Sequence, residues 1–231
     1  MEFLQRQINL IGEEATKKLQ SSRVAVFGLG GVGSFVVEAL ARAGVGSLVI
    51  CDNDTIAPHN INRQLYALHS TVGKYKTEVC YKRCKDINPN INIEVKTLYF
   101  DHNTQEQFDL SSCTYIADCI DSVTSKLLLI QKANDLNVKI ISCMGTGNKL
   151  NCNFLVSDIS KTKVCPLARV MRRELFRRNI KKLKCVYSEE LPVYNDQESN
   201  EERRVPSSIS FVPPTAGLLI AGEIIKDIIK N

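Results

Sequence analysis

A short apolar run leads directly into a glycine-rich turn, and this junction limits the possible folds of the 231-residue chain more than any other feature. Residues 23–27 have the sequence Arg-Val-Ala-Val-Phe, which is typical of a buried strand. The sequence Gly-Leu-Gly-Gly-Val-Gly follows, and a stretch of helical period extends over residues 32–43. A strand, a glycine turn and a helix in this order indicate a βαβ unit that binds nucleotide phosphates.

The alternation of short apolar runs and longer helical stretches continues along the chain. It predicts parallel strands joined by helices, because parallel neighbours need a long crossover connection. Further strands are expected at residues 47–51, 91–98, 115–118 and 139–143, with helices at 13–20, 74–88, 104–109 and 123–137. The predicted fold class is therefore α/β, a Rossmann-like, doubly wound and mostly parallel sheet.

The C-terminal third of the chain differs in character from the rest. We expect a single domain over residues 1–231, in which a nucleotide-binding core (residues 1–147) continues into an extension (residues 148–231). The extension is predicted to contain antiparallel C-terminal strands and a basic helical segment. Its predicted parts are a strand at 150–156, the basic segment at 161–184, a mobile acidic loop at 188–204 and a helix at 215–229.

The basic segment is the most uneven part of the charge distribution. It holds ten lysines and arginines against one glutamate, whereas the net charge of the whole chain is only +5. Such a run repels itself unless a polyanion neutralises it, so we interpret the segment as an RNA-binding surface. A solvated helix face is the alternative, although such faces normally mix both signs. The candidate RNA-binding residues are Arg169, Arg172, Arg173, Arg177, Arg178, Lys181 and Lys182.

Several other classes of protein are disfavoured by the composition. No run of about 18 apolar residues is present, so a membrane span is not expected. The first residues are charged and lack the apolar run of a secretion signal, which predicts a cytoplasmic protein. The nine cysteines are odd in number and include no CxxC pair, so buried free thiols are expected rather than disulfides or a zinc site.

Small and acidic residues stand where the first two predicted strands end. Glycines let backbone N–H groups approach phosphate, and Asp52, nineteen residues past Gly33, closes the second strand where an acidic side chain usually meets ribose hydroxyls. A tight turn without a ligand is the alternative. The candidate nucleotide contacts at this edge are Gly28, Gly30, Gly31, Gly33, Asp52 and Asp54.

Three further features favour ATP over a nicotinamide cofactor. Asn60, Arg63 and Gln64 follow the second strand, and a planar guanidinium suits a triphosphate. Lys76 enters a helix after a glycine turn, which suits phosphate, and Asp121 follows the fourth strand, which suits magnesium. The alternatives are solvent-exposed cations at the first two positions and an aspartate that caps the next helix at the third.

These motifs resemble a known superfamily. Over about residues 1–144 the set resembles the adenylating superfamily of ubiquitin-activating and sulfur-carrier-activating enzymes. It consists of Arg6, the glycine turn, Asp52-x-Asp54, Asn60-x-x-Arg63-Gln64, Lys76 and Asp121. Over nearly the whole chain the sequence resembles the tRNA threonylcarbamoyladenosine dehydratases. The stretches that carry this second resemblance are residues 144–150, 158–161, 165–175 and 208–213.

The resemblance implies an activity and a set of residue roles. In the dehydratases, ATP activates the carboxylate of a threonylcarbamoyl group on adenosine in tRNA, and a nearby nitrogen closes a ring. The implied contacts are Gly30 and Gly31 to the nucleotide, Asp52 to ribose, Asn60, Arg63 and Lys76 to the phosphates, Asp121 to Mg²⁺, and Arg6 to the ATP site of the partner protomer in a homodimer. For Arg6 alone, an exposed basic face on an N-terminal helix is an equal alternative.

Two rival functions remain open at this point. The first is an adenylating enzyme that activates the C-terminus of a ubiquitin-like sulfur-carrier protein and works with a sulfur-transfer partner. The pair of CxxC zinc motifs usual in those relatives is absent, and the acidic loop holds no cysteine for a thiol relay. The second is a catalytically inactive nucleotide sensor, against which the intact Arg63, Lys76 and Asp121 argue.

Overall fold

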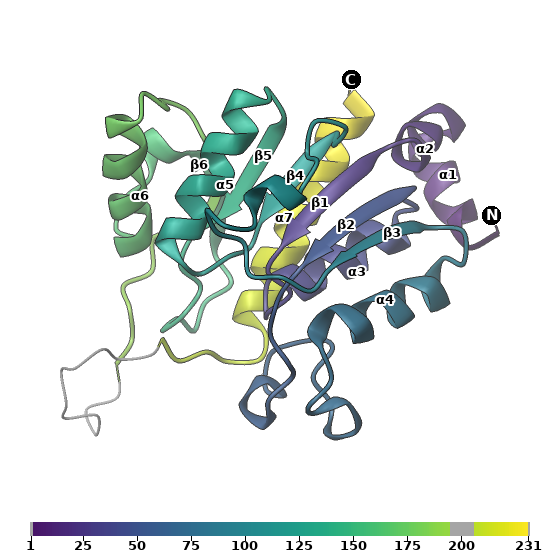
Figure 1. Ribbon diagram of the computed structural model, residues 1–231, viewed down its shortest axis with the longest axis horizontal. Helices are drawn as coiled ribbons and strands as arrows, with labels where there is room; N and C mark the ends of the chain where they lie inside the picture. Colours follow the sequence, from purple (N-terminus) through teal and green to yellow (C-terminus); the bar gives the residue numbers. More distant parts are fainter. Residues whose placement is uncertain (1, 195–205, 231) are drawn as a thin grey trace.

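The computed structural model describes residues 2–194 and 206–230, which form a seven-stranded sheet with helices on both faces (Figure 1). The strand order is β3-β2-β1-β4-β5-β7-β6, and only the β6–β7 pair is antiparallel. The strands are β1 (Arg23–Phe27), β2 (Ser47–Cys51), β3 (Asn92–Lys96), β4 (Tyr115–Asp118), β5 (Lys139–Cys143), β6 (Phe154–Asp158) and β7 (Lys184–Ser188). The predicted Rossmann-like, mostly parallel α/β fold is confirmed.

Two helical layers cover the sheet (Figure 1). One layer packs α3, α4 and α7 on one face, and the other packs α5 and α6 on the opposite face. The helices are α1 (Gln5–Ile11), α2 (Glu13–Gln20), α3 (Gly33–Arg42), α4 (Lys76–Ile87), α5 (Val123–Asp135), α6 (Pro166–Arg177) and α7 (Val212–Lys230). The single-turn 3-10 helices are η1 (Glu2–Leu4), η2 (Pro58–Asn60), η3 (His69–Thr71), η4 (Gln105–Gln107) and η5 (Ile159–Lys161).

The apolar character of the central strands follows from this layering. In β1, Val24 and Val26 contribute to the core on the α3 side, while Ala25 and Phe27 contribute to the core on the α5 side. A strand buried on both faces has apolar residues at consecutive positions, which explains the unbroken run in the sequence. The chain leaves β1 toward β2 on one side and reaches β4 on the other, so the order of strands reverses at β1. Ligands of doubly wound sheets bind at such a reversal.

The last helix connects the C-terminal part of the chain to the glycine turn. α7 packs along α3 and α2, and it begins three residues earlier than predicted, with Pro213 and Pro214 in its first turn. A Cβ atom on Gly217 of this helix would lie 2.4 Å from the Val32 carbonyl oxygen, so glycine permits the close approach. One continuous sheet and one helix layer therefore unite residues from both ends of the chain.

The four central strands β1, β2, β4 and β5 have the predicted bounds, whereas the basic segment does not form the single helix predicted for it. α6 ends at Arg177, Asn179 adopts a left-handed conformation with φ of 59°, and β7 follows. Cys185, Val186 and Tyr187 of β7 are buried. The lysines that precede these residues led to the prediction of a helix, whereas the structure has a core strand here. This strand lies parallel to β5 and antiparallel to β6.

Other predicted bounds also need correction. The strand predicted at 150–156 is β6, shifted toward the C-terminus, and the helix predicted at 104–109 is reduced to the single turn η4. An additional helix, α1, precedes α2. The predicted acidic loop begins inside β7 at Ser188, and the Glu190 carboxylate accepts hydrogen bonds from the Leu150 and Asn151 N–H groups at 2.9 and 3.0 Å. The part of that loop from 195 to 204 lies outside the described residues.

No helix in the described ranges is both long enough and apolar enough to cross a bilayer. Each of the nine cysteines is a free thiol, and seven of them are buried. Burial raises the pKa of Cys51, Cys143 and Cys185 to about 12, so these thiols stay protonated near neutral pH.

Candidate functional site

The glycine turn between β1 and α3 is built on two very close backbone approaches. Gly28 has φ of 86°, and a Cβ atom there would lie 2.7 Å from the Cys119 carbonyl oxygen. A Cβ atom on Gly33 would lie 1.7 Å from the Gly28 carbonyl oxygen. At Gly30 the nearest atom to such a Cβ would be Gln64 Nε2, at 3.8 Å. Packing within the chain therefore requires Gly28 and Gly33, whereas at Gly30 a Cβ atom would make only an ordinary contact with one flexible side chain.

Arg63 lies beside this turn. A Cβ atom on Gly31 would be 3.4 Å from the Arg63 Cγ atom and 3.0 Å from Pro213 of α7. The Arg63 Nη1 atom donates hydrogen bonds to the His59 carbonyl oxygen at 2.9 Å and to Asn62 Oδ1 at 2.8 Å. These contacts orient one edge of the guanidinium and keep the side chain at the carboxyl edge of the sheet.

Asp52 joins the glycine turn to the end of β2. Its carboxylate accepts hydrogen bonds from the N–H groups of Leu29, at 2.7 Å, and Asp54, at 2.9 Å. Burial raises the pKa of the Asp52 carboxyl, and the Lys76 ammonium and the two N–H donors oppose that rise. The carboxylate thus holds the turn at the position where the sequence predicted a contact to ribose.

Lys76 occupies the first position of α4 and points back to the end of β2. Its Nζ atom lies 2.6 Å from Asp54 Oδ2 and 3.6 Å from Asp52 Oδ1. The ammonium is buried, whereas the Asp54 side chain is 59% exposed. Asn60 is buried as well, and its Oδ1 atom accepts a hydrogen bond from the Ala57 N–H group at 3.0 Å. The predicted cation and amide therefore lie at the same edge of the sheet as Asp52.

Asp121 follows β4 and is exposed. Among residues 2–194 and 206–230 it makes no hydrogen bond and no ion pair, and the residue that caps α5 is Ser122, without a side-chain hydrogen bond. The helix-cap alternative is therefore not supported by a contact. No group of three or more metal-ligand side chains occurs in the described part of the chain. A lone carboxylate still suits Mg²⁺, which usually takes one or two carboxylates and completes its shell with phosphate oxygens and water.

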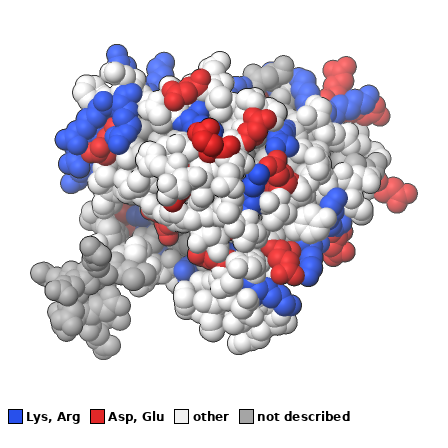
Figure 2. Space-filling view, in the orientation of Figure 1, with Lys and Arg blue, Asp and Glu red and all other residues white. Residues whose placement is uncertain are grey.

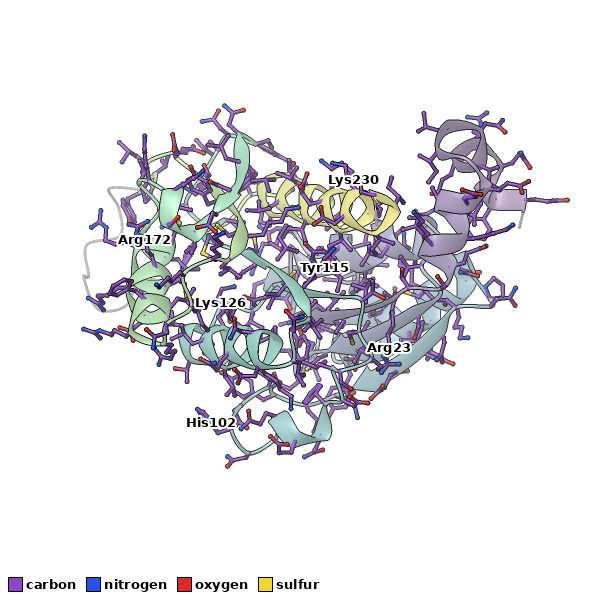
Figure 3. All side chains as sticks on the ribbon, turned by 90° about the horizontal axis from the view of Figure 1, so that it is seen from above. Arg23, His102, Tyr115, Lys126, Arg172 and Lys230 are labelled. Atoms are coloured by element: carbon purple, nitrogen blue, oxygen red, sulfur yellow. The ribbon has the colours of Figure 1, made fainter. Side chains whose placement is uncertain are left out.

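A second group of polar side chains at this edge was not predicted from the sequence as part of the site. Asp118 at the end of β4 and Lys126 of α5 are fully buried, and Lys126 Nζ lies 2.9 Å from Asp118 Oδ2. The Ser142 hydroxyl of β5 donates to the same carboxylate oxygen. Figure 3 shows Lys126 on the side of α5 that faces the sheet. A lysine directly before three leucines was the available signal, because a charged residue in an apolar helical run is rarely buried without a partner.

Arg6 lies away from these residues. The neighbouring Gln7 side chain donates a hydrogen bond to the Ala43 carbonyl oxygen, at the end of α3 opposite the glycine turn. Ten helical residues separate the two ends, a distance of about 15 Å. Arg6 is exposed between Phe3, which is 46% exposed, and Leu10, which is 84% exposed. The structure therefore does not bring Arg6 to the nucleotide site of its own chain.

The predicted RNA-binding cations are not equivalent. Lysine and arginine side chains gather over α6 at one end of the molecule (Figure 2). Arg169, Arg173 and Arg177 are exposed, but Arg172 is half-buried and its Nη1 atom donates to the Thr162 carbonyl oxygen at 2.8 Å. Arg172 thus contacts the segment before α6, and its Nη1 atom is engaged within the chain. Arg177 and Arg178 also pair with Glu174.

Comparison with known proteins decides the family. The model of the ThiF family matches residues 4–231. The chain belongs to the ThiF family. Within this family it is 38% identical over 234 residues to the tRNA threonylcarbamoyladenosine dehydratase of Bacillus subtilis, across 96% of this chain and 92% of that protein. It is 34% identical to the Escherichia coli dehydratase over 167 residues, across 72% and 62% of the two chains. The resemblance to this dehydratase family is confirmed.

Solved structures of ThiF-family proteins give the same result. The E. coli tRNA N6-threonylcarbamoyladenosine dehydratase TcdA in complex with ATP superposes with a TM-score of 0.90 at 28% identity, covering 99% of this chain and 94% of that one. Its complex with AMP gives a TM-score of 0.89 at 29% identity, with coverage of 97% and 93%.

The yeast adenylyltransferase and sulfurtransferase UBA4 is a relative with a different activity. It is 35% identical over 133 residues, but this match covers only 57% of this ThiF-family chain and 30% of UBA4.

Proposed function

We propose that this protein is an ATP-dependent dehydratase of the cytoplasm that converts N6-threonylcarbamoyladenosine in tRNA to its cyclic form. The observation that carries the proposal is the match to tRNA threonylcarbamoyladenosine dehydratases across both parts of the chain. An E. coli relative that shares the fold is solved with ATP, and this chain has a glycine turn between β1 and α3, where the sequence predicts phosphate contacts. The sulfur-carrier alternative is weaker, because its relatives match a shorter part of the chain.

The proposed chemistry solves a leaving-group problem. A carboxylate is a poor electrophile because oxide would have to leave. A carboxylate oxygen of the substrate attacks a phosphorus atom of ATP and releases pyrophosphate or ADP, which gives a mixed anhydride. A nitrogen of the same nucleoside then attacks the activated carbonyl, loses its proton, and expels AMP or phosphate. Proximity within one nucleoside supplies the nucleophile, so no covalent enzyme intermediate is needed.

Arg63 and Lys76 are the proposed phosphate ligands. Lys76 pairs with the carboxylate of Asp54, whose side chain is 59% exposed, and phosphate oxygens of ATP are the proposed replacement for this partner. The Nη1 edge of Arg63 is held by backbone and Asn62, which leaves the planar group oriented for charge that builds on the phosphates. Asp121 is the proposed protein ligand of Mg²⁺, and the ion would supply positive charge to the reacting phosphates when bound.

Exchange of Arg63 for lysine is expected to lower ATP turnover by about 10-fold or more, because lysine keeps the charge but loses the paired hydrogen bonds of the guanidinium. Phosphate and pyrophosphate release with modified tRNA measures the effect. Arg42→Lys, on the exposed end of α3, is the matched control and should behave as the parent. Equal activity of Arg63→Lys and the parent would show that Arg63 is not a phosphate clamp.

A homodimer with shared sites is the proposed assembly. Arg6 stands between exposed Phe3 and Leu10, which suits an apolar contact with another protomer. Leu68, Val72 and Tyr75 are also exposed, between the site residues Gln64 and Lys76. Exposed apolar residues on η1 and α1, and others beside the nucleotide site, fit an arrangement in which Arg6 of one protomer reaches the site of its partner.

Mixed subunits test this arrangement. Arg6→Ala and Asp121→Ala proteins are each expected to be inactive, and equal random mixing should restore about a quarter of parental activity, because half of the dimers are mixed and one of their two sites is intact. The measurement is ATP turnover after unfolding and joint refolding. A mixture no more active than its components would remove the role of Arg6 in the partner's site.

The proposed tRNA surface is the exposed face of α6 and the segment after it. Its cations are Arg169, Arg173, Arg177, Arg178, Lys181 and Lys182, without Arg172. Reversal of charge in Arg169→Glu with Arg173→Glu is expected to weaken tRNA binding by roughly 10-fold or more and to reduce the log–log salt slope by about 1.4 to 1.8, at 0.7 to 0.9 per phosphate contact.

The matched control for this reversal is Lys17→Glu with Lys230→Glu. Both lysines are exposed and lie on α2 and α7, away from α6 (Figure 1). This pair should bind tRNA as the parent does, and ATP affinity should be unchanged in both variants. Parental tRNA binding by the α6 variant at moderate salt would exclude this surface and favour a protein substrate.

Nucleoside analysis tests the function as a whole. Cells that lack the protein are expected to accumulate the linear threonylcarbamoyladenosine in tRNA, and the purified protein should convert it to the cyclic form with ATP. A parallel reaction with a sulfur-carrier protein tests the alternative. Pyrophosphate release with the carrier and not with tRNA would overturn the proposal, and no turnover with either would favour the nucleotide sensor.

A further inference from the structure

A buried ion pair contacts Ile120, the residue before the proposed magnesium ligand, and has no role in the chemistry above. It joins Asp118 of β4 to Lys126 of α5, and the Ser142 hydroxyl of β5 donates to the same carboxylate. Asp118 and Ser142 are neighbours across the parallel ladder, so the group connects two strands and one helix. Both charged side chains are fully buried.

The pair forms hydrogen bonds with the turn that precedes Asp121. Asp118 Oδ1 accepts a hydrogen bond from the Ile120 N–H group at 3.2 Å, and Lys126 Nζ donates to the Ile120 carbonyl oxygen at 3.0 Å. The preceding Cys119 carbonyl lies against Gly28 of the glycine turn, where a Cβ atom would be 2.7 Å from its oxygen. The peptide groups on both sides of Ile120 are therefore held, and Asp121 is the next residue.

The side chain of Asp121 has no such support. Within the described ranges it makes no hydrogen bond and no ion pair, so its location depends on the backbone that precedes it. A buried ion pair often adds little net stability compared with apolar side chains of similar size. Its location at the end of the sheet where ligands bind suggests a different benefit, the accurate placement of a ligand group.

We infer that Asp118 and Lys126 are positioning residues, which hold the β4–α5 turn so that the Asp121 carboxylate faces the phosphates of bound ATP. This inference rests on the proposed function. Both side chains are fully buried, so their proposed effect on bound ATP is indirect. Their contribution is transmitted through the Ile120 peptide, in the way that outer-shell partners of metal ligands act.

The test replaces the pair by uncharged side chains in Asp118→Asn with Lys126→Met. ATP affinity is measured by calorimetry with and without Mg²⁺, and hydrogen exchange of the Ile120 amide is followed in the absence of ligands. We expect the gain in affinity that Mg²⁺ provides to fall by about 10-fold, the low end for outer-shell changes, while metal-free ATP affinity stays within about threefold. Ile120 should exchange faster, and the amides of β1 should not.

The matched control is Glu38→Gln with Arg83→Met, which removes an ion pair between α3 and α4 with N–O distances of 2.7 and 2.9 Å. It should leave both readouts as in the parent. The milder variant Ser142→Ala removes only the hydroxyl that donates to Asp118. It should reduce the gain in ATP affinity that Mg²⁺ provides by about threefold. An unchanged magnesium gain in both site variants overturns the inference.

A background without Asp121 separates positioning from a general structural role. In Asp121→Ala the same double substitution should cause no further loss of the magnesium gain, because the positioned carboxylate is already absent. An equal additional loss in this background contradicts the inference. A parent protein without ATP-dependent cyclisation refutes the proposed function and this inference with it, whereas an active parent with insensitive variants refutes the inference alone.

Discussion

Replacement of Asp121 by alanine is expected to lower tRNA-dependent ATP turnover by at least about 100-fold. Without this carboxylate the protein loses its proposed ligand for the Mg²⁺ that would stabilise charge on the reacting phosphates. Stability should hardly change. The side chain is exposed and makes no hydrogen bond or ion pair in the described part of the chain, and such surface substitutions usually fall within about 0.5 kcal/mol. Release of phosphate or pyrophosphate and thermal unfolding measure the two effects.

A second carboxylate on α5 provides the control for this variant. Asp135 is exposed at the opposite end of the same helix, where it accepts a hydrogen bond from the Gln131 amide at 2.8 Å. Asp135→Ala should retain parental turnover. If Asp121→Ala also turns over ATP at a near-parental rate, the metal assignment is wrong.

Replacement of Gly33 by alanine is expected to destabilise the protein by about 3 kcal/mol or more and to abolish ATP binding. The new Cβ atom would lie 1.7 Å from the Gly28 carbonyl oxygen, which is a backbone atom, so the clash cannot be relieved by movement of a flexible side chain. Either α3 or the turn must shift, which displaces the N–H groups that approach phosphate. Urea denaturation and calorimetric titration with ATP measure the two effects.

Gly222 offers the same substitution without the clash. It lies within α7, and a Cβ atom there would meet no atom within 4 Å. Gly222→Ala should therefore stabilise the protein by about 0.5 to 1 kcal/mol, because alanine loses less conformational freedom in a helix than glycine. If Gly33→Ala proves as stable as Gly222→Ala and binds ATP, the close approach at the turn does not exist in solution.

The local part of this protein could be derived from its sequence. Strands buried on both faces have unbroken apolar runs, so β1, β2, β4 and β5 were predicted with their observed bounds. The glycine turn could be predicted as well, since the strand, the glycines and the helix follow one another directly in the chain. Parallel strands end at one edge of a sheet, and for this reason Asp52, Arg63 and Lys76 could be expected to meet there.

Contacts between distant segments were decided only by the tertiary structure. The sequence of β7 follows lysines that belong to a helical pattern, and its place between β5 and β6 depends on pairing that no local period reports. Arg172 carries the same charge as its exposed neighbours, yet it is half-buried and donates a hydrogen bond to the Thr162 carbonyl oxygen. Lys126 can be buried because Asp118, eight residues earlier, ends the adjacent strand. A side chain's charge is set by its own residue type, whereas its burial and partner are set by the segments that pack around it.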